Sequence, residues 1–201
     1  MSETEFIIQD PEVPNKQVGQ TLQWKDMQPL SPLRYLCGHC GNKVASDKGY
    51  GAGWNVQIYI CPQCHEPTYK NLSYTLPGEL IGEEVSGLPE MVRQLYQETR
   101  QCTTVSAYTA SLSLARILLI HIAIERGADE GSTFQQCVNY LQSNFLPPKT
   151  DNGWVDQIRK MGNEVTHDFK VAKKIEAQNI ILFLEFLLKI LYELPAKIKK
   201  G

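Results

Sequence analysis

Two pairs of cysteines could bind a metal ion. Cys37 and Cys40 form one CxxC pair, and after twenty residues Cys61 and Cys64 form a second. Tight turns containing Gly or Pro at both pairs would let four thiolates converge on one ion. Four thiolates at about 2.3 Å make a closed tetrahedral zinc site with no open position for water. The spacing therefore predicts structural Zn²⁺, because a module this small cannot bury enough core to fold alone.

Other roles for the cysteines and their neighbours stay open at this point. His39 and His65 lie inside or beside the two pairs, and either imidazole could replace a thiolate. A redox disulfide within either pair is a further alternative, although two such pairs are better explained by one metal. Cys102 and Cys137 have no CxxC partner, and we expect them to be ordinary small buried side chains.

A second group of polar residues lies in a predicted helix over Trp154–Asp168. Arg159, Asn163 and His167 follow one another at steps of four, which places them on one strip of the helix. A strip that joins a cation, an amide and a titratable imidazole is a candidate catalytic or binding site. The structural alternative is that Asn163 and His167 bond a neighbouring helix.

The most apolar segment, Leu112–Ile124, is predicted to be the central buried helix, and two polar residues interrupt it. Arg116 cannot lose its charge, so it needs an internal acceptor or an anionic ligand. His121 is expected to be a hydrogen-bonded core histidine. Arg116 is thus a further candidate for the catalytic or anion-binding group.

The overall charge argues against nucleic-acid binding through a large basic surface. The formal net charge is −2 and the sequence pI is about 6.1. An anionic partner must therefore bind a local patch, for which residues 159–174 are the candidate. The nucleic-acid-binding residues expected there are Lys160, Lys170, Lys173 and Lys174. The alternative is an ordinary solvated charged face.

Changes in composition and hydrophobic pattern along the chain predict an α+β, predominantly α protein in four parts. Residues 1–30 are polar and form an extended arm, with one short strand at Phe6–Ile8. Residues 31–75 form a small β zinc ribbon, in which Trp54, Val56, Ile58 and Ile60 alternate with polar residues as a half-buried strand. Residues 76–88 are a linker, and residues 89–201 form a helical bundle.

Start and stop signals define the helices of the bundle. The expected elements are a helix over Glu90–Cys102, a second capped by Thr103 or Thr104 and ending near Arg126, a short helix opened by a Ser132–Gln135 capping box, and a last one from Lys173 to Glu193 stopped by Pro195. The last helix has more apolar residues than one core stripe needs. This surplus indicates either a homodimer or the centre of the bundle.

We find no targeting signal or membrane-spanning segment in the sequence pattern. The N-terminal residues have no basic start and no apolar run of signal-peptide length, and Ile180–Leu191 is too short to span a bilayer. We therefore expect a soluble cytoplasmic protein without a membrane partner.

From residue 33 onward the chain resembles a bacterial family known as domain of unknown function 4145. The matching pieces, in order, are CGHC, CPQC, SLAR at Ser113–Arg116, IRKMGNEVTH at Ile158–His167 and LYELP at Leu191–Pro195. That family is similar to the HEPN superfamily, whose helical domains often dimerise and occur in toxin–antitoxin, restriction and antiphage systems. The resemblance implies a zinc ribbon followed by a HEPN-like bundle.

Many HEPN proteins are metal-independent ribonucleases with an arginine, a polar residue and, after three more residues, a histidine. In this chain Asn163 and His167 match the polar residue and the histidine, but Gly162 stands where the arginine should be. The resemblance therefore implies an interaction module that binds nucleic acid, RNA rather than DNA, or a partner protein in bacterial defence. The alternative is a ribonuclease in which His167 moves protons while Arg159 or Arg116 stabilises the transition state.

Overall fold

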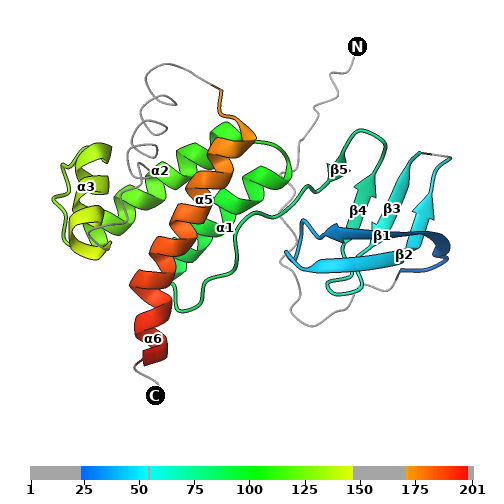
Figure 1. Cartoon of the computed structure of the whole chain (residues 1–201), viewed down its shortest axis with the longest axis horizontal. Coiled ribbons are helices and arrows are strands. Elements are labelled where there is room, and N and C mark those ends of the chain that lie inside the picture. The colour runs from blue at the N-terminus through cyan, green and yellow to red at the C-terminus, as the bar shows by residue number, and fades with distance from the viewer. Residues whose placement is uncertain (1–23, 54, 147–170, 199–201) are drawn as a thin grey trace, which may run out of the picture.

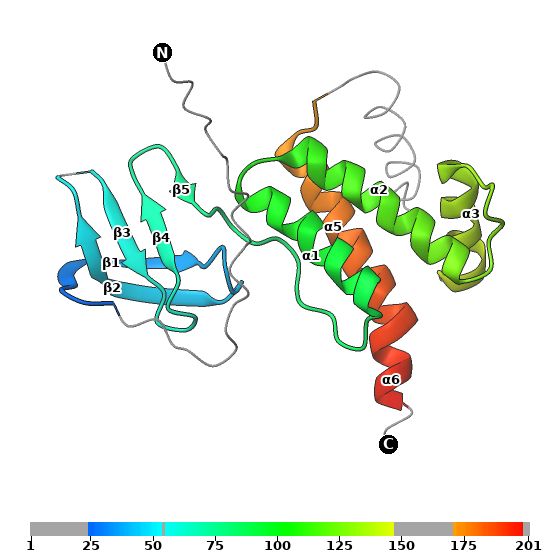
Figure 2. The same cartoon turned by 180° about the vertical axis from the view of Figure 1, so that it is seen from behind.

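The computed structural model describes residues 24–53, 55–146 and 171–198. Figure 1 and Figure 2 show two parts side by side, an antiparallel sheet and a group of helices, joined by an extended segment. The expected α+β class is confirmed. The predicted strand at Phe6–Ile8 lies outside the described residues.

The sheet contains five strands in the order in which they follow one another along the chain. Each strand pairs antiparallel with the next. The strands are β1 (Gln28–Leu36), β2 (Lys43–Gly51), β3 (Gln57–Ile60), β4 (Pro67–Lys70) and β5 (Thr75–Leu76). In this meander the β1–β2 and β3–β4 connections lie at the same end of the sheet, so the two CxxC pairs come together there.

The predicted alternation in β3 is only partly correct. Ile60 is buried as expected, but Tyr59, which the pattern assigns to the polar face, is only 2% exposed. Its hydroxyl donates to the backbone oxygen of Ser31 at 2.9 Å. A tyrosine can be buried in this way because the rim of a small sheet supplies an acceptor for its one polar atom.

The helical part is built from α1 (Glu90–Thr104), α2 (Tyr108–Glu125), α3 (Phe134–Phe145) and α5 (Lys174–Leu188), followed by a π-helical turn, η1 (Lys189–Glu193), and α6 (Leu194–Ile198). The expected central helix is confirmed, since α2 packs against α1, α3 and α5. By length and composition alone α2 is also apolar enough to cross a membrane, but a central core helix has the same composition.

All seven apolar residues that form the surplus in the last helix are buried within the chain. They are Ile180, Ile181, Phe183, Leu184, Leu187, Leu188 and Leu191. They belong to one core cluster with side chains of α1, α2 and α3. The surplus is therefore used inside the bundle, and the homodimer stays a prediction.

Two expected helix starts are displaced. Thr103 and Thr104 do not cap α2 but form the last turn of α1, where each hydroxyl bonds a backbone oxygen three residues earlier. The break comes afterwards, at Ser106 with φ +61°. The capping box of α3 uses Thr133 and Gln136, not Ser132 and Gln135. The error at α3 arises because adjacent hydroxyl residues offer equivalent local caps, whereas α2 starts after Ala107 with no side-chain cap.

The expectation that Pro195 ends the last helix is wrong, since α6 continues through it. Proline has no N–H, so the Leu191 carbonyl four residues earlier loses its usual helical donor. The Arg126 guanidinium supplies a replacement from the end of α2, donating from Nη2 to this carbonyl at 3.1 Å. The guanidinium also lies 4.4 Å from the centre of the Tyr192 ring.

Residues 77–89, here called the connecting segment, cross from the sheet and lie along the helices. Val85 is only 6% exposed and belongs to the helical core. The Glu185 carboxylate accepts the backbone N–H of Glu83, and the Glu193 carboxylate accepts that of Ser86, each at 2.9 Å. At Gly82, with φ +77°, a Cβ would lie 2.8 Å from an Ile181 methyl group. The segment is therefore fitted closely to the helical surface.

Acid is expected to weaken the contact between the connecting segment and the C-terminal helix. Lys197 Nζ, at 2.6 Å, and the Ser86 N–H both donate to Glu193 and hold its pKa at about 2, below the ordinary 4.5. Because the folded-state pKa is lowered, this contribution to stability is complete above about pH 4.5 and is lost as the pH falls toward about 2.

Thermal melts of the wild type and of Glu193→Gln across that pH range measure the effect. The wild type should exceed the variant in Tm near neutral pH, and the difference should shrink in acid. Glu130→Gln, which removes an exposed carboxylate elsewhere, should follow the wild type. A Tm difference that does not change with pH would contradict the role of Glu193.

Candidate metal centre and the predicted polar sites

The two CxxC pairs form turns with matching backbone hydrogen bonds. In the first, the Gly41 N–H bonds Cys37 O at 2.9 Å, and in the second the His65 N–H bonds Cys61 O at 2.9 Å. The residue after the second cysteine adopts positive φ in both turns, +72° at Gly41 and +61° at His65. A non-glycine residue rarely takes this conformation, and its presence at His65 shows how strongly the turn geometry is imposed.

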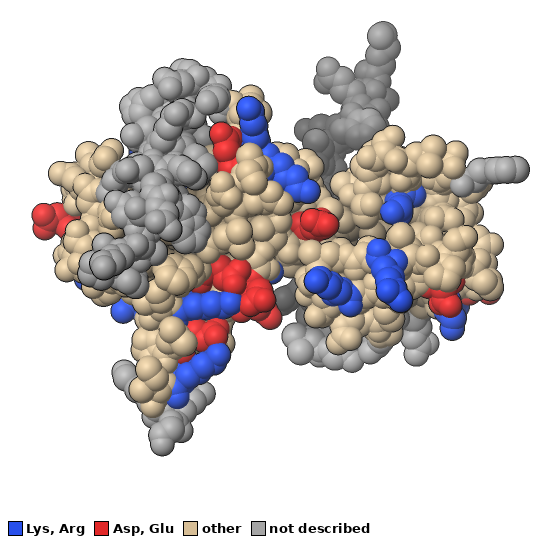
Figure 3. All heavy atoms as spheres, viewed as in Figure 1, with Lys and Arg blue, Asp and Glu red and all other residues tan. Residues whose placement is uncertain are grey.

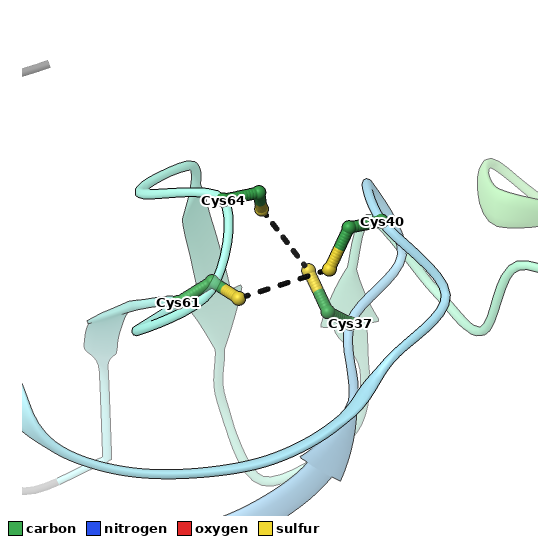
Figure 4. Close-up of side chains that lie close together, drawn as sticks. All are labelled: Cys37, Cys40, Cys61 and Cys64. Atoms are coloured by element: carbon green, nitrogen blue, oxygen red, sulfur yellow. Dashed lines mark hydrogen bonds between the residues drawn. The ribbon is translucent and has the colours of Figure 1, made fainter. Parts of the chain in front are cut away.

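The four cysteine side chains point toward one another across the end of the sheet (Figure 4). The Sγ atoms of Cys37 and Cys64 are 3.8 Å apart, those of Cys40 and Cys61 are 3.9 Å apart, and all four lie within 4.8 Å of one another. Sulfurs about 2.3 Å from a central ion at tetrahedral corners are about 3.8 Å apart. The four cysteines could therefore hold a metal ion.

The donor set of four cysteine sulfurs suits a tetrahedral ion. A disulfide requires about 2.05 Å between sulfurs, so neither pair is oxidised. His39 is exposed, and its Nε2 lies 3.0 Å from Pro67 O, so its imidazole is engaged elsewhere. The described residues that form the cluster are the four cysteines alone.

The environment of the cluster differs from one thiol to the next. Burial raises the pKa of Cys37 and Cys64. Burial also acts to raise the pKa of Cys40, but the backbone and side chain of Asn42, together with the neighbouring thiols, outweigh it and lower that pKa. Outside the cluster, Cys137 is fully buried and Cys102 is half-buried, and burial raises the pKa of both thiols. The burial expected for Cys137 is thus confirmed, whereas Cys102 is less buried than expected.

The first turn also fixes the sheet against the connecting segment. A Cβ on Gly38 would lie 2.1 Å from Gly78 O and 2.8 Å from the Pro77 ring, so only glycine fits there. The Gly78 N–H in turn donates to Thr104 O, at the end of α1, at 2.6 Å. The candidate metal centre is therefore linked to the helices through two successive close backbone contacts.

Most of the predicted polar strip lies outside the described residues. This applies to the catalytic candidates Arg159, Asn163 and His167 and to the basic residues Lys160 and Lys170. Arg116 is described, and its guanidinium lies 4.7 Å from the centre of the Phe134 ring, between α2 and α3. His121 is half-exposed rather than a core histidine, with Nε2 3.8 Å from the Glu125 carboxylate one turn later. The apolar sequence around His121 concealed that its own face of α2 is open to solvent.

Lys173 and Lys174 lie at the start of α5. Lys173 is the residue before the helix, and its backbone N–H bonds the Glu176 carboxylate at 2.7 Å. Both lysine side chains are exposed. The local basic character that the sequence predicts is therefore available to a partner at this helix end.

Arg100 is a functional candidate that sequence reasoning missed. It is only 6% exposed and lines a cavity of about 740 Å³ between the cysteine turns and α1, to which Cys40 and Cys64 also contribute. Four thiolates around a divalent ion leave net negative charge, and the Arg100 guanidinium is a buried cation on the wall of this cavity. Its place in an ordinary amphipathic helix gave no signal in the sequence.

Comparison with known proteins gives one match. The sequence model of the family described as "Domain of unknown function (DUF4145)" matches residues 97–200, just over half of the 201 residues. The matched region comprises most of α1 and the rest of the helices, and the sheet with its cysteines lies outside it. No curated protein and no solved structure matches the chain. On its helical region, the chain belongs to the DUF4145 family of domains of unknown function.

Proposed function

We propose that this protein is a zinc-stabilised interaction module that binds nucleic acid. The observation that carries the proposal is the group of four sulfurs within 4.8 Å of one another with no other ligand type among them. A tetrathiolate site is coordinatively closed, so its metal stabilises a surface rather than activating water. Zinc is the ion we assign, because it is redox-inert and suits four thiolates in a small ribbon.

Exposed cations support nucleic acid as the partner. Lys173 and Lys174 are exposed at the start of α5. In Figure 3, Lys and Arg side chains lie on both sides of the boundary between the helices and the sheet. Such side chains bind phosphates through counterion release, even when the net charge of the chain is slightly negative. We also propose that the bundle is HEPN-like and that the protein acts in bacterial defence. If the test finds no nucleic-acid binding, the partner is a protein.

The test measures binding and cleavage on the same samples. Purified protein is titrated into fluorescent single-stranded RNA, single-stranded DNA and duplex DNA at several salt concentrations, without added metal or chelator. We expect binding that weakens steeply with salt and RNA that remains intact. The His167→Ala variant should bind the same nucleic acids as the wild type, with the same salt dependence, and should also leave the RNA intact.

Two results would contradict the proposal. Absence of binding to all three nucleic acids at low salt would leave a protein as the partner. RNA cleavage by the wild type that disappears in His167→Ala would replace the binding module by the ribonuclease, with Arg159 or Arg116 as the charge-stabilising group.

A further inference from the structure

A second cleft, separate from the cysteine cluster, lies where the sheet meets the starts of two helices. Its volume is about 380 Å³. The sheet contributes Arg34 from β1 and Lys70 from β4, and the helical part contributes Lys174 and Tyr108. Three segments that are far apart in the sequence therefore bring cations to one concave surface. None of Arg34, Lys70 or Lys174 was expected from the sequence to meet another.

The charge in this cleft is strongly unbalanced. Arg34, Lys70 and Lys174 contribute three positive charges, and Glu79 is the one acid among the described lining residues. Within residues 24–53, 55–146 and 171–198, no ion pair involves any of the three cations. Elsewhere on the helices, by contrast, Lys189 and Lys197 are both paired with glutamates. The whole chain is slightly acidic, so this local excess of positive charge is specific to the cleft and favours an anionic ligand.

The start of α2 adds to this preference. α2 begins at Tyr108 with no side-chain cap and no acidic residue in its first turn. The Ala172 N–H donates to Thr109 Oγ1 at 3.0 Å, which ties the start of α2 to the residues before α5. The first N–H groups of a helix carry partial positive charge, so the start of α2 supports the cations, whereas at α5 the Glu176 carboxylate offsets that charge.

We infer that this cleft binds a phosphate group of single-stranded nucleic acid. The inference rests on the proposed function and names the site at which it operates. A volume of about 380 Å³ is that of a small-ligand pocket and suits a phosphate with its nucleotide. Tyr108 also lines the cleft and is partly exposed, and an aromatic side chain is the type of group on which an unpaired base stacks.

The experiment compares two triple variants with equal loss of charge. Arg34→Gln, Lys70→Gln and Lys174→Gln together remove the cations of the cleft. Lys25→Gln, Lys43→Gln and Lys48→Gln together remove three exposed lysines that do not line it. Binding to a single-stranded RNA oligonucleotide, to a mononucleotide and to inorganic phosphate is measured over a range of salt. Circular dichroism and metal content verify that both variants are folded.

We expect the cleft variant to bind the oligonucleotide at least tenfold more weakly at low salt. Each phosphate contact on a single strand contributes about 0.7 to the slope of log K against log salt, so loss of the one phosphate held in the cleft should lower the slope by about 0.7. The control variant should stay within about twofold of the wild type, with an almost unchanged slope.

The possible failures are distinguishable. Equal weakening in both triple variants, or none in either, overturns the cleft while the nucleic-acid function stands. A third outcome is that the mononucleotide or inorganic phosphate binds in a way that depends on the cleft, while the oligonucleotide does not bind. The ligand would then be a small phosphate compound and not a nucleic acid, and this result would overturn the proposed function as well. No binding of any of the three overturns both.

Discussion

Replacing Cys61 with serine is expected to abolish metal binding and unfold the sheet, while the helices remain folded. Among the described residues of the sheet and its cysteine turns, four are buried hydrophobic residues, namely Cys37, Tyr59, Ile60 and Cys61. The large core cluster begins at Val85 and contains no strand residue. A sheet with so little core depends on its metal for folding. In small zinc-dependent domains, zinc binding contributes on the order of 10–16 kcal/mol to the free energy of folding.

Metal analysis and amide hydrogen exchange check this expectation together. The wild type should contain one zinc per chain and protected amides in β1–β4, and Cys61→Ser should contain none and lose that protection. Removal of zinc with a strong chelator should reproduce the variant. Cys102→Ser changes a half-buried cysteine outside the cluster and should keep both the metal and the protection. A wild-type protein that keeps a protected sheet without metal would contradict the structural role.

Replacing Arg100 with alanine is expected to destabilise the helical part by about 3 kcal/mol. Arg100 Nε donates to Ile81 O at 2.9 Å and Nη2 donates to Gly82 O at 2.6 Å. Its guanidinium also lies 5.5 Å from the centre of the Tyr96 ring. Alanine would leave two carbonyls of the connecting segment without their charged donor and would open space beside a buried aromatic ring.

Urea unfolding followed by the helical circular dichroism signal measures the loss. Arg93→Ala is the matched control, because Arg93 is on the same helix and forms an exposed ion pair with Glu90. An exposed pair contributes about 0–1 kcal/mol, so the control should unfold almost as the wild type does. Equal effects of the two substitutions would show that the contact of Arg100 with the connecting segment does not stabilise the fold.

The features that sequence could predict are those with local causes. The CxxC turns are short, and each is closed by hydrogen bonds within six residues, from Cys37 to Asn42 and from Cys61 to Glu66. The order of the helices follows from hydrophobic periodicity, which acts over a few turns, and the central place of α2 follows from its nearly continuous apolar sequence. The cap of α3 was wrong by one residue because two hydroxyl residues stand side by side and each could have served, and the cap of α2 was wrong by three or four residues because that helix starts after Ala107 without a side-chain cap.

The features that sequence could not predict depend on distant contacts. Pro195 signals a helix end unless another chain segment supplies the missing donor, and here that donor is Arg126, nearly seventy residues away. Arg100 looks like a solvated residue of an amphipathic helix until the connecting segment covers it. The cleft containing Arg34, Lys70 and Lys174 exists only when the sheet packs beside the helices. Of the predicted helix strip, Arg159, Asn163 and His167 lie outside the described residues.

The close fit of residues 77–89 determines how this protein can be divided. The family match begins at Gln97, inside α1, so a fragment cut there would lose the first turns of that helix. A fragment begun at Glu90 would keep α1 but remove Val85 from the core and strip Glu185 and Glu193 of their backbone donors. In recombination between relatives, residues 77–89 would have to be inherited with the helices, and the sheet could be exchanged only upstream of them.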